Sequence, residues 1–113
     1  MVNQGDIIWI DFDPQSGTEQ KGRRPALVVS NQRYHKITRR RAVVCPITKT
    51  DKDYPIHVKL DGSLQTKGVV LSDQMKVVDL ASRTYEFIEK APLEVTQEVV
   101  DIISKLVEYY QKS

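Results

Sequence analysis

Hydrophobic and polar residues alternate along most of the chain in short stretches that predict β-strands. In the first of these, residues 6–13, Ile8, Ile10 and Phe12 fall at every second position, which is the period of a strand. Short apolar runs bounded by turn residues predict further strands at residues 26–30, 42–47, 56–60, 69–71, 75–80 and 85–88. The runs at 26–30 and 42–47 are nearly continuous, which is typical of strands buried on both faces.

The pattern changes near the end of the chain, where it predicts one amphipathic helix. From Pro92 to Tyr110, apolar residues recur every three or four positions, which places them on one helical face. The polar segment 31–41 has room for a short helical turn between two strands. Several short strands followed by one helix predict a mainly β protein, a small and strongly curled β-barrel with a C-terminal α-helix packed on it.

Length and composition narrow the classes of protein that this chain can belong to. The 113 residues predict one domain, and 40% hydrophobic with 28% charged residues excludes a disordered chain and a membrane-spanning one. The first residues carry no basic start followed by an apolar core, so we expect a cytoplasmic protein without a secretory signal. A single cysteine, Cys45, excludes a disulfide scaffold, and with only His35 and His57 beside it a zinc site is not expected. Cys45 and His57 lie within strand patterns and are interpreted as structural.

The net charge of +2 conceals an uneven distribution. Residues 1–60 carry a net charge of +5 and residues 61–113 a net charge of −3. Five basic residues fall within nine positions, namely Arg33, Lys36, Arg39, Arg40 and Arg41. Such a cluster can bind a phosphate backbone by displacing its counterions, or it can be a solvated turn between strands. Charge alone favours the solvated turn and leaves RNA contact open.

One long polar loop carries residues suited to chemistry. Residues 14–24 contain two glycines, and loops of this length in a small domain are usually functional. Pro25 favours an extended conformation at Arg24, which places that arginine where the next strand begins, five residues after Glu19. A carboxylate can accept a proton while a guanidinium clamps a phosphate. An ordinary surface ion pair is the alternative.

Six short segments together carry a family resemblance. They are Gly5-Asp6-Ile7-Ile8-Trp9, Asp11-Phe12-Asp13-Pro14, Gly17-Thr18-Glu19-Gln20, Gly22-Arg23-Arg24-Pro25-Ala26, Cys45-Pro46-Ile47-Thr48, and Asp73-Gln74 after Gly68-Val69-Val70. In this order and spacing, over residues 5–79, they resemble the MazF/PemK family of endoribonuclease toxins from type II toxin–antitoxin modules. Each segment alone is common, and the resemblance rests on their order along the chain.

The resemblance implies a fold, a reaction and partners. The fold is the SH3-like (CcdB/PemK-like) barrel, and the protein is a homodimer whose groove accepts single-stranded RNA. The reaction is a ribosome-independent, sequence-specific cleavage of mRNA without a metal or other cofactor. The substrate's 2′-hydroxyl attacks the adjacent phosphate and leaves a 2′,3′-cyclic phosphate and a 5′-hydroxyl. A MazE-like antitoxin with an acidic, disordered tail neutralises the toxin, which otherwise inhibits translation.

The same resemblance assigns roles to individual residues. Glu19 is the base for the 2′-hydroxyl, Arg24 neutralises charge on the phosphate, and Thr48 donates a hydrogen bond to a non-bridging oxygen. Because an arginine rarely gives up a proton, we favour charge neutralisation over proton donation for Arg24. The residues expected to contact RNA are Gln20, Lys21, Arg23, Asp73, Gln74 and Lys76. Thr18 and Leu71 stand where some PemK-type toxins have histidine and arginine, which favours the pair Glu19 and Arg24 here.

Two alternatives remain for the function. One is a non-enzymatic toxin that inhibits gyrase on the same fold through its terminal helix and last residues. The chain ends Tyr109-Tyr110-Gln111-Lys112-Ser113, without a tryptophan anchor for that mode. The other is a degenerate family member that binds RNA without cutting it, and the presence of Glu19, Arg24 and Thr48 argues against it.

Overall fold

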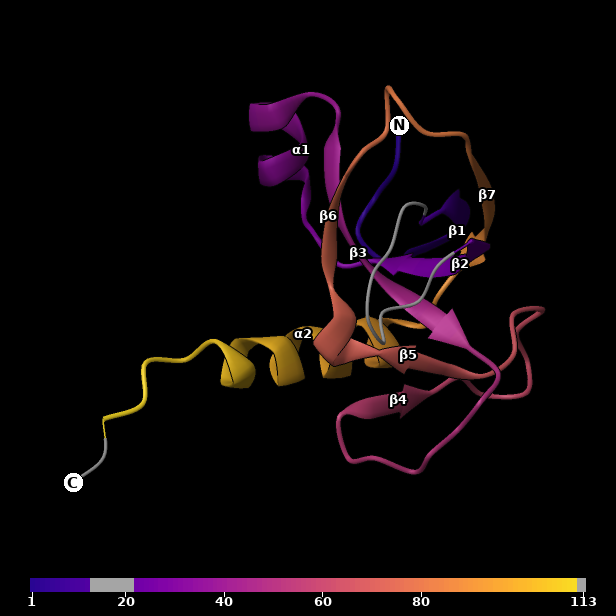
Figure 1. Ribbon diagram of the computed structural model, residues 1–113, viewed down its shortest axis with the longest axis vertical. Helices are drawn as coiled ribbons and strands as arrows, with labels where there is room; N and C mark the ends of the chain where they lie inside the picture. The colour runs from indigo at the N-terminus through magenta and orange to yellow at the C-terminus, as the bar shows by residue number, and fades with distance from the viewer. Residues whose placement is uncertain (13–21, 112–113) are drawn as a thin grey trace.

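The computed structural model describes residues 1–12 and 22–111, which form a curled β-sheet with two α-helices (Figure 1). The strands are β1 (Asp6–Asp11), β2 (Arg23–Val28), β3 (Arg41–Thr48), β4 (His57–Lys59), β5 (Val69–Leu71), β6 (Lys76–Asp79) and β7 (Tyr85–Lys90). The helices are α1 (Gln32–Thr38) and α2 (Leu93–Leu106), with a 3₁₀ turn η1 (Ser72–Gln74). Neither α-helix in this part of the chain is long and apolar enough to cross a bilayer.

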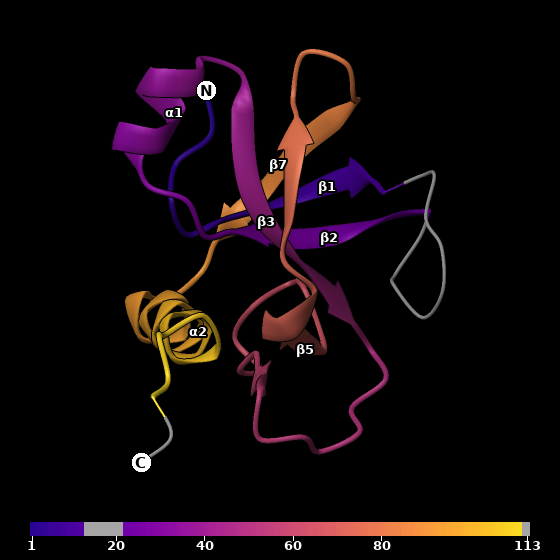
Figure 2. The same ribbon diagram turned by 60° about the vertical axis from the view of Figure 1, so that its left-hand side comes forward.

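Strand β3 is the central element of the sheet. The strand order is β4-β5-β3-β2-β1-β7, β6 also pairs with β3, and all pairs are antiparallel. The beginning of β3 pairs with β6, its middle with β2, and its last two residues with β5. The sheet therefore bends at β3, as Figure 2 shows, and curls into a barrel-like form without closing among the described strands. The expectation of a mainly β, barrel-like fold with a C-terminal helix is confirmed.

Alternation along the strands divides the interior into two clusters. On one face, Ile7 packs with Leu27 and Cys45 under Val95 and Val99 of α2. On the other face, the core consists of Val2, Ile8, Ile10, Phe12, Ala26, Val28, Ala42, Val44 and Val78. Strands β2 and β3 lie between the two clusters, so both strands are buried on their two faces, as their apolar runs predict. Burial raises the pKa of the Cys45 thiol to about 12, which fits a structural residue.

Three of the differences from the sequence-based expectations have a clear physical reason. Strand β2 begins at Arg23, before the apolar run, because its backbone pairs with β1 through positions that include Pro25 opposite Trp9. Within the polar segment 31–41, residues 32–38 form the helix α1, which is longer than a single turn and whose N-terminus is capped by the side chain of Asn31. Helix α2 ends at Leu106, short of Tyr110, because the residues beyond it are exposed and gain no packing.

Candidate functional site

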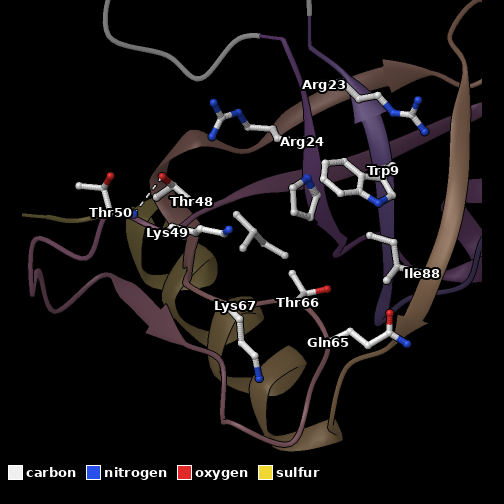
Figure 3. A pocket seen from close by; sticks show the side chains of 12 residues that line it. Trp9, Arg23, Arg24, Thr48, Lys49, Thr50, Gln65, Thr66, Lys67 and Ile88 are labelled. Atoms are coloured by element: carbon white, nitrogen blue, oxygen red, sulfur yellow. Dashed lines mark hydrogen bonds between the residues drawn. The ribbon is translucent and has the colours of Figure 1, made fainter.

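The strand register brings Arg24 and Thr48 together from different parts of the sequence. Ala26 of β2 lies opposite Pro46 of β3, and continuing this register by two residues places Arg24 level with Thr48. Both residues are half-buried, and Figure 3 shows the Arg24 guanidinium on the same side as the Thr48 hydroxyl. Two of the three residues expected to be catalytic thus meet at one point of the sheet.

Arg24 and Thr48 stand between two cavities and line both of them. Thr50, which follows Thr48 after β3, lines both as well, and we call these three residues the shared wall. The first cavity has a volume of about 490 Å³ and the second about 570 Å³. The backbone N–H of Thr50 donates a hydrogen bond to Thr48 Oγ1 at 3.3 Å, so the Thr48 hydroxyl proton is available to a ligand.

One side of the first cavity is built from β1, β2 and β7. The Arg23 guanidinium lies 5.7 Å from the centre of the Trp9 ring, and its Nη2 is 3.1 Å from Glu86 Oε1. Trp9 is 38% exposed, so part of its ring is available for stacking. Lys49 and Lys67 add further positive charge to this cavity. A flat aromatic surface beside several cations suits an anionic ligand that carries a planar group.

The opposite side of the first cavity is a loop that contains Gln65 and Thr66, and Glu89 of β7 holds this loop. The Glu89 carboxylate accepts hydrogen bonds from the backbone N–H of Gln65 at 3.1 Å and from the N–H and hydroxyl of Thr66, both at 2.7 Å. Partial burial raises the pKa of Glu89, but these hydrogen bonds outweigh burial and hold it below its usual value. The ionised form of Glu89 is therefore the form that holds the loop.

Gly68 fixes the distance between this loop and β3. Its φ is +123°, a conformation that favours glycine, and a Cβ at this position would collide with the backbone carbonyl oxygen of Thr48. The close approach lets β5 pair with the end of β3 through Val69 opposite Thr48. The position of the shared wall thus depends on the absence of a side chain at residue 68.

The second cavity combines an acid, an amide and two rings. Asp73 and Gln74 of η1 line it together with Tyr54 and His57. His57 Nε2 lies 3.8 Å from Asp73 Oδ1, and the Tyr54 and His57 ring centres are 5.0 Å apart. The buried His57 Nδ1 has no hydrogen-bond partner among the described residues. These groups can accept or donate hydrogen bonds at the edge of a base, with Tyr54 as a partly exposed ring at the rim.

Sequence reasoning missed Trp9, Lys49 and Lys67 in the first cavity, and Tyr54 and His57 in the second. It also missed Thr50, which lines both. The strand pattern predicts a structural role for His57, and its side chain is 7% exposed, yet it lines the second cavity. Alternation shows which residues share a face of a strand and gives no sign of a cavity beside it. Before this strand, the dipeptide Tyr54-Pro55 departs from the alternation, but it indicates neither a ligand nor a reaction.

The other residues expected at the site are distributed unequally. Arg23 lines the first cavity, while Asp73 and Gln74 line the second. Lys76 lies on β6 opposite Val44 and lines neither cavity. Glu19, Gln20 and Lys21 lie outside the described residues.

Comparison with known proteins gives the family. A family model described as "PemK-like, MazF-like toxin of type II toxin-antitoxin system" matches residues 3–107. The Escherichia coli K12 endoribonuclease toxin MazF is 43% identical over 81 residues, which cover 72% of this chain and 71% of that protein. The crystal structure of MazF from Deinococcus radiodurans has a TM-score of 0.88 and 39% identity, with 96% of this chain and 97% of that chain covered.

A MazE–MazF crystal structure from Deinococcus radiodurans is also similar, with a TM-score of 0.82 and 37% identity over 96% of this chain and 98% of that chain. The match of residues 3–107 and the identity to an endoribonuclease toxin confirm the resemblance that the sequence motifs carry. The chain therefore belongs to the PemK-like, MazF-like family of endoribonuclease toxins from type II toxin–antitoxin systems.

Proposed function

We propose that this protein is a ribosome-independent, sequence-specific endoribonuclease that cleaves single-stranded mRNA without a metal ion. The observation that carries the proposal is the shared wall, where Arg24 and Thr48 meet between two cavities. A phosphodiester placed over the wall has one nucleotide on each side, and each cavity has room for one. Cations line the first cavity, and hydrogen-bonding side chains line the second.

Arg24 and Thr48 act on the phosphate. The guanidinium can donate two parallel hydrogen bonds to phosphate oxygens and neutralise the charge that builds up in the pentavalent transition state. The Thr48 hydroxyl donates to a non-bridging oxygen, since its oxygen already accepts from the Thr50 N–H. Fixed donors of this kind stabilise the transition state more than the ground state, which is the requirement for catalysis.

The remaining step is proton transfer. Glu19, which lies outside the described residues, takes the proton from the 2′-hydroxyl as the O2′–P bond forms. The P–O5′ bond breaks, and the leaving 5′-oxygen takes up a proton from water. The products are a 2′,3′-cyclic phosphate and a 5′-hydroxyl. The role of Glu19 rests on the sequence motif alone, whereas the positions of Arg24 and Thr48 in the fold support their roles.

We infer the partners from the family and from the charge of the site. A MazE-like antitoxin would cover the shared wall with an acidic segment, because the first cavity carries Arg23, Lys49 and Lys67. The solved MazE–MazF complex of a similar chain supports an antitoxin of this kind. The toxin would act as a homodimer in the cytoplasm, where its mRNA substrate lies.

The test is RNA cleavage in EDTA. Purified protein is incubated with a long single-stranded RNA, and the fragment ends are mapped. We expect 5′-hydroxyl ends at one recurring sequence, and loss of cleavage in Arg24→Ala and Thr48→Val. Lys105→Gln, an exposed change on α2, is the matched control and should cleave normally. Intact RNA with inhibited DNA supercoiling would instead identify a gyrase inhibitor, and bound but intact RNA a degenerate member.

A further inference from the structure

The five clustered basic residues form one exposed surface far from the shared wall. Helix α1 carries two of them, and the residues that lead into β3 carry the rest; we call Arg33, Lys36, Arg39, Arg40 and Arg41 the basic surface. All five are exposed. Figure 1 places α1 and the start of β3 at the end of the molecule opposite α2 and β4, and Figure 2 again shows α1 opposite α2. Since β3 spans Arg41 to Thr48, the basic surface and the wall lie at its two ends, about 23 Å apart.

The charge of the basic surface is mostly uncompensated. Asp79 on β6 binds Arg40, with Arg40 Nε at 3.0 Å and Nη2 at 2.5 Å from Asp79 Oδ2. The hydrogen bond from Arg40 holds the pKa of Asp79 below its usual value. Within residues 1–12 and 22–111, no salt bridge joins an acidic group to Arg33, Lys36, Arg39 or Arg41. Of the five cations, Arg40 is the one that forms an ion pair with a carboxylate among these residues.

The backbone that carries these cations is fixed. Arg39 ends α1 with φ of 68°, and its N–H donates to the carbonyl of His35 at 2.7 Å. The N–H of Arg41 donates to the hydroxyl of Thr38 at 3.2 Å. Three consecutive arginines are thus presented on a defined turn, which lowers the ordering cost when they bind a ligand.

Two adjoining hollows extend from this turn to exposed aromatic rings. The first, about 240 Å³, has Arg39, Arg40, Arg41 and Tyr85 among its lining residues. The second, about 460 Å³, shares Tyr85 with the first and continues to Phe87. Tyr85 is 36% and Phe87 59% exposed, and both lie on the same face of β7 because they are two residues apart.

We propose that the basic surface with Tyr85 and Phe87 is a second RNA-binding surface, which holds a single-stranded segment that flanks the segment cleaved at the shared wall. Cations along a groove with exposed rings at its edge are the combination that binds single-stranded nucleic acid, through phosphates and stacked bases. The inference rests on the proposed function, because it gives the same RNA a second contact. It makes affinity depend on RNA length, since a short RNA reaches only one of the two surfaces.

The test compares two lengths of an RNA that cannot be cut. All-2′-O-methyl RNAs of mixed sequence, about 30 and about 6 nucleotides long, are titrated against the full chain, the longer covering more than one site of typical size. The variant Arg39→Gln/Arg41→Gln should bind the long RNA at least about tenfold more weakly, and its log Kd against log salt slope should fall by about 1.4. Affinity for the short RNA should fall much less.

Two further variants distinguish the contribution of charge to RNA binding from the contribution of base stacking and from a loss of folding. Tyr85→Leu keeps an apolar side chain without a flat ring, and should weaken binding of the long RNA about fivefold at an unchanged salt slope. Lys105→Gln removes one exposed cation on α2 and should leave the ratio of long to short affinity as in the wild type. Thermal melting of each variant verifies that the protein is folded.

Three results would overturn the proposal. One is an unchanged affinity of Arg39→Gln/Arg41→Gln for the long RNA. Another is an equal loss for both lengths, which would make the basic surface part of the cleavage site. The third is normal RNA binding with weakened binding of an acidic peptide, which would make it a protein-binding surface. Cleavage of ordinary RNA by the wild type is scored separately, so failure of the proposed nuclease is distinguishable.

Discussion

The two ends of β3 present polar groups in opposite ways. At the Thr48 end, the candidate side chains Arg24 and Thr48 are half-buried. The Thr48 hydroxyl accepts a hydrogen bond from the Thr50 N–H, and Glu89 holds the adjoining loop. At the Arg41 end, the side chains are exposed, and Asp79 is the carboxylate that pairs with them among the described residues. One strand therefore connects a region of fixed geometry with a region of concentrated charge.

The difference between the two ends of β3 matches the role proposed for each of them. Catalysis requires donors within a fraction of an ångström of their positions in the transition state, and only packing provides that. Attraction of a polyanion requires a positive field, which survives side-chain motion but is screened by salt. The Thr48 end should accordingly be sensitive to small changes of shape, and the Arg41 end to ionic strength.

The largest effect is expected for Arg24→Ala. Loss of the guanidinium should lower kcat by at least roughly 10²–10³, or about 2.7–4 kcal/mol of barrier, measured by single-turnover cleavage. The loss should persist at every salt concentration, because the guanidinium acts on the transition state at short range. Arg24→Lys, which keeps the charge without the bidentate fork, should recover only part of the rate. If Arg24→Lys recovered the full kcat, the Thr48 end of β3 would act through charge alone, as is proposed for the Arg41 end.

Thr48→Val tests the same end with a smaller change. Valine has nearly the shape of threonine, so the fold should persist while the hydroxyl donor disappears. We expect kcat to fall by roughly 10², with little change in KM. Thr48→Ser restores the hydroxyl and should restore most of the rate. If Thr48→Ser is as slow as Thr48→Val, the methyl group and not the hydroxyl is what matters.

Gly68→Ala tests whether packing positions the wall. The added Cβ meets the Thr48 carbonyl in a conformation unfavourable for alanine, so the protein should lose about 2–3 kcal/mol of stability and part of its activity. Gly62→Ala is the control, because a Cβ there meets open space and should leave Tm unchanged. Equal melting of the two variants would contradict a tight approach of Gly68 to β3.

Glu89→Gln should have the smallest effect, and one that depends on pH. The folded protein holds the pKa of Glu89 below its unfolded value, so its stabilisation is present above the unfolded pKa and is lost as pH falls through the folded pKa. At pH 7 the variant should be less stable by about 1.5 kcal/mol. The difference in Tm should shrink as the pH falls below about 4.3. Glu98→Gln on α2 is the control, and a pH-independent difference for Glu89→Gln would contradict this account.

Much of the fold could be predicted because it depends on local periodicity. Ile8, Ile10 and Phe12 show the alternation of β1, and their faces follow from it directly. The apolar pattern predicts the start of β2 too late, because Arg23 and Pro25 have no strand-like side chains although the backbone there pairs with β1. The apolar period predicts too late an end for α2, because this period continues beyond Leu106, where no tertiary contact supports a helix.

The candidate site could be predicted as a set of residues and not as an arrangement. Motifs identified Arg24 and Thr48, but only the register of β2 against β3 brings them level, and one sequence does not specify a register. His57 reaches the second cavity through the pairing of β4 with β5, a contact between distant segments. Local patterns carry no information on such contacts.

The shared wall has a consequence for inhibitor design. A compound confined to one cavity leaves Arg24 and Thr48 open on their other side. A compound that blocks the wall needs an anionic centre over these two residues and an arm into each cavity. The arm in the first cavity would carry a ring beside Trp9. The arm in the second cavity would carry a hydrogen-bond donor that points towards Asp73. Joining two weak fragments across the wall should therefore gain more affinity than enlarging either one.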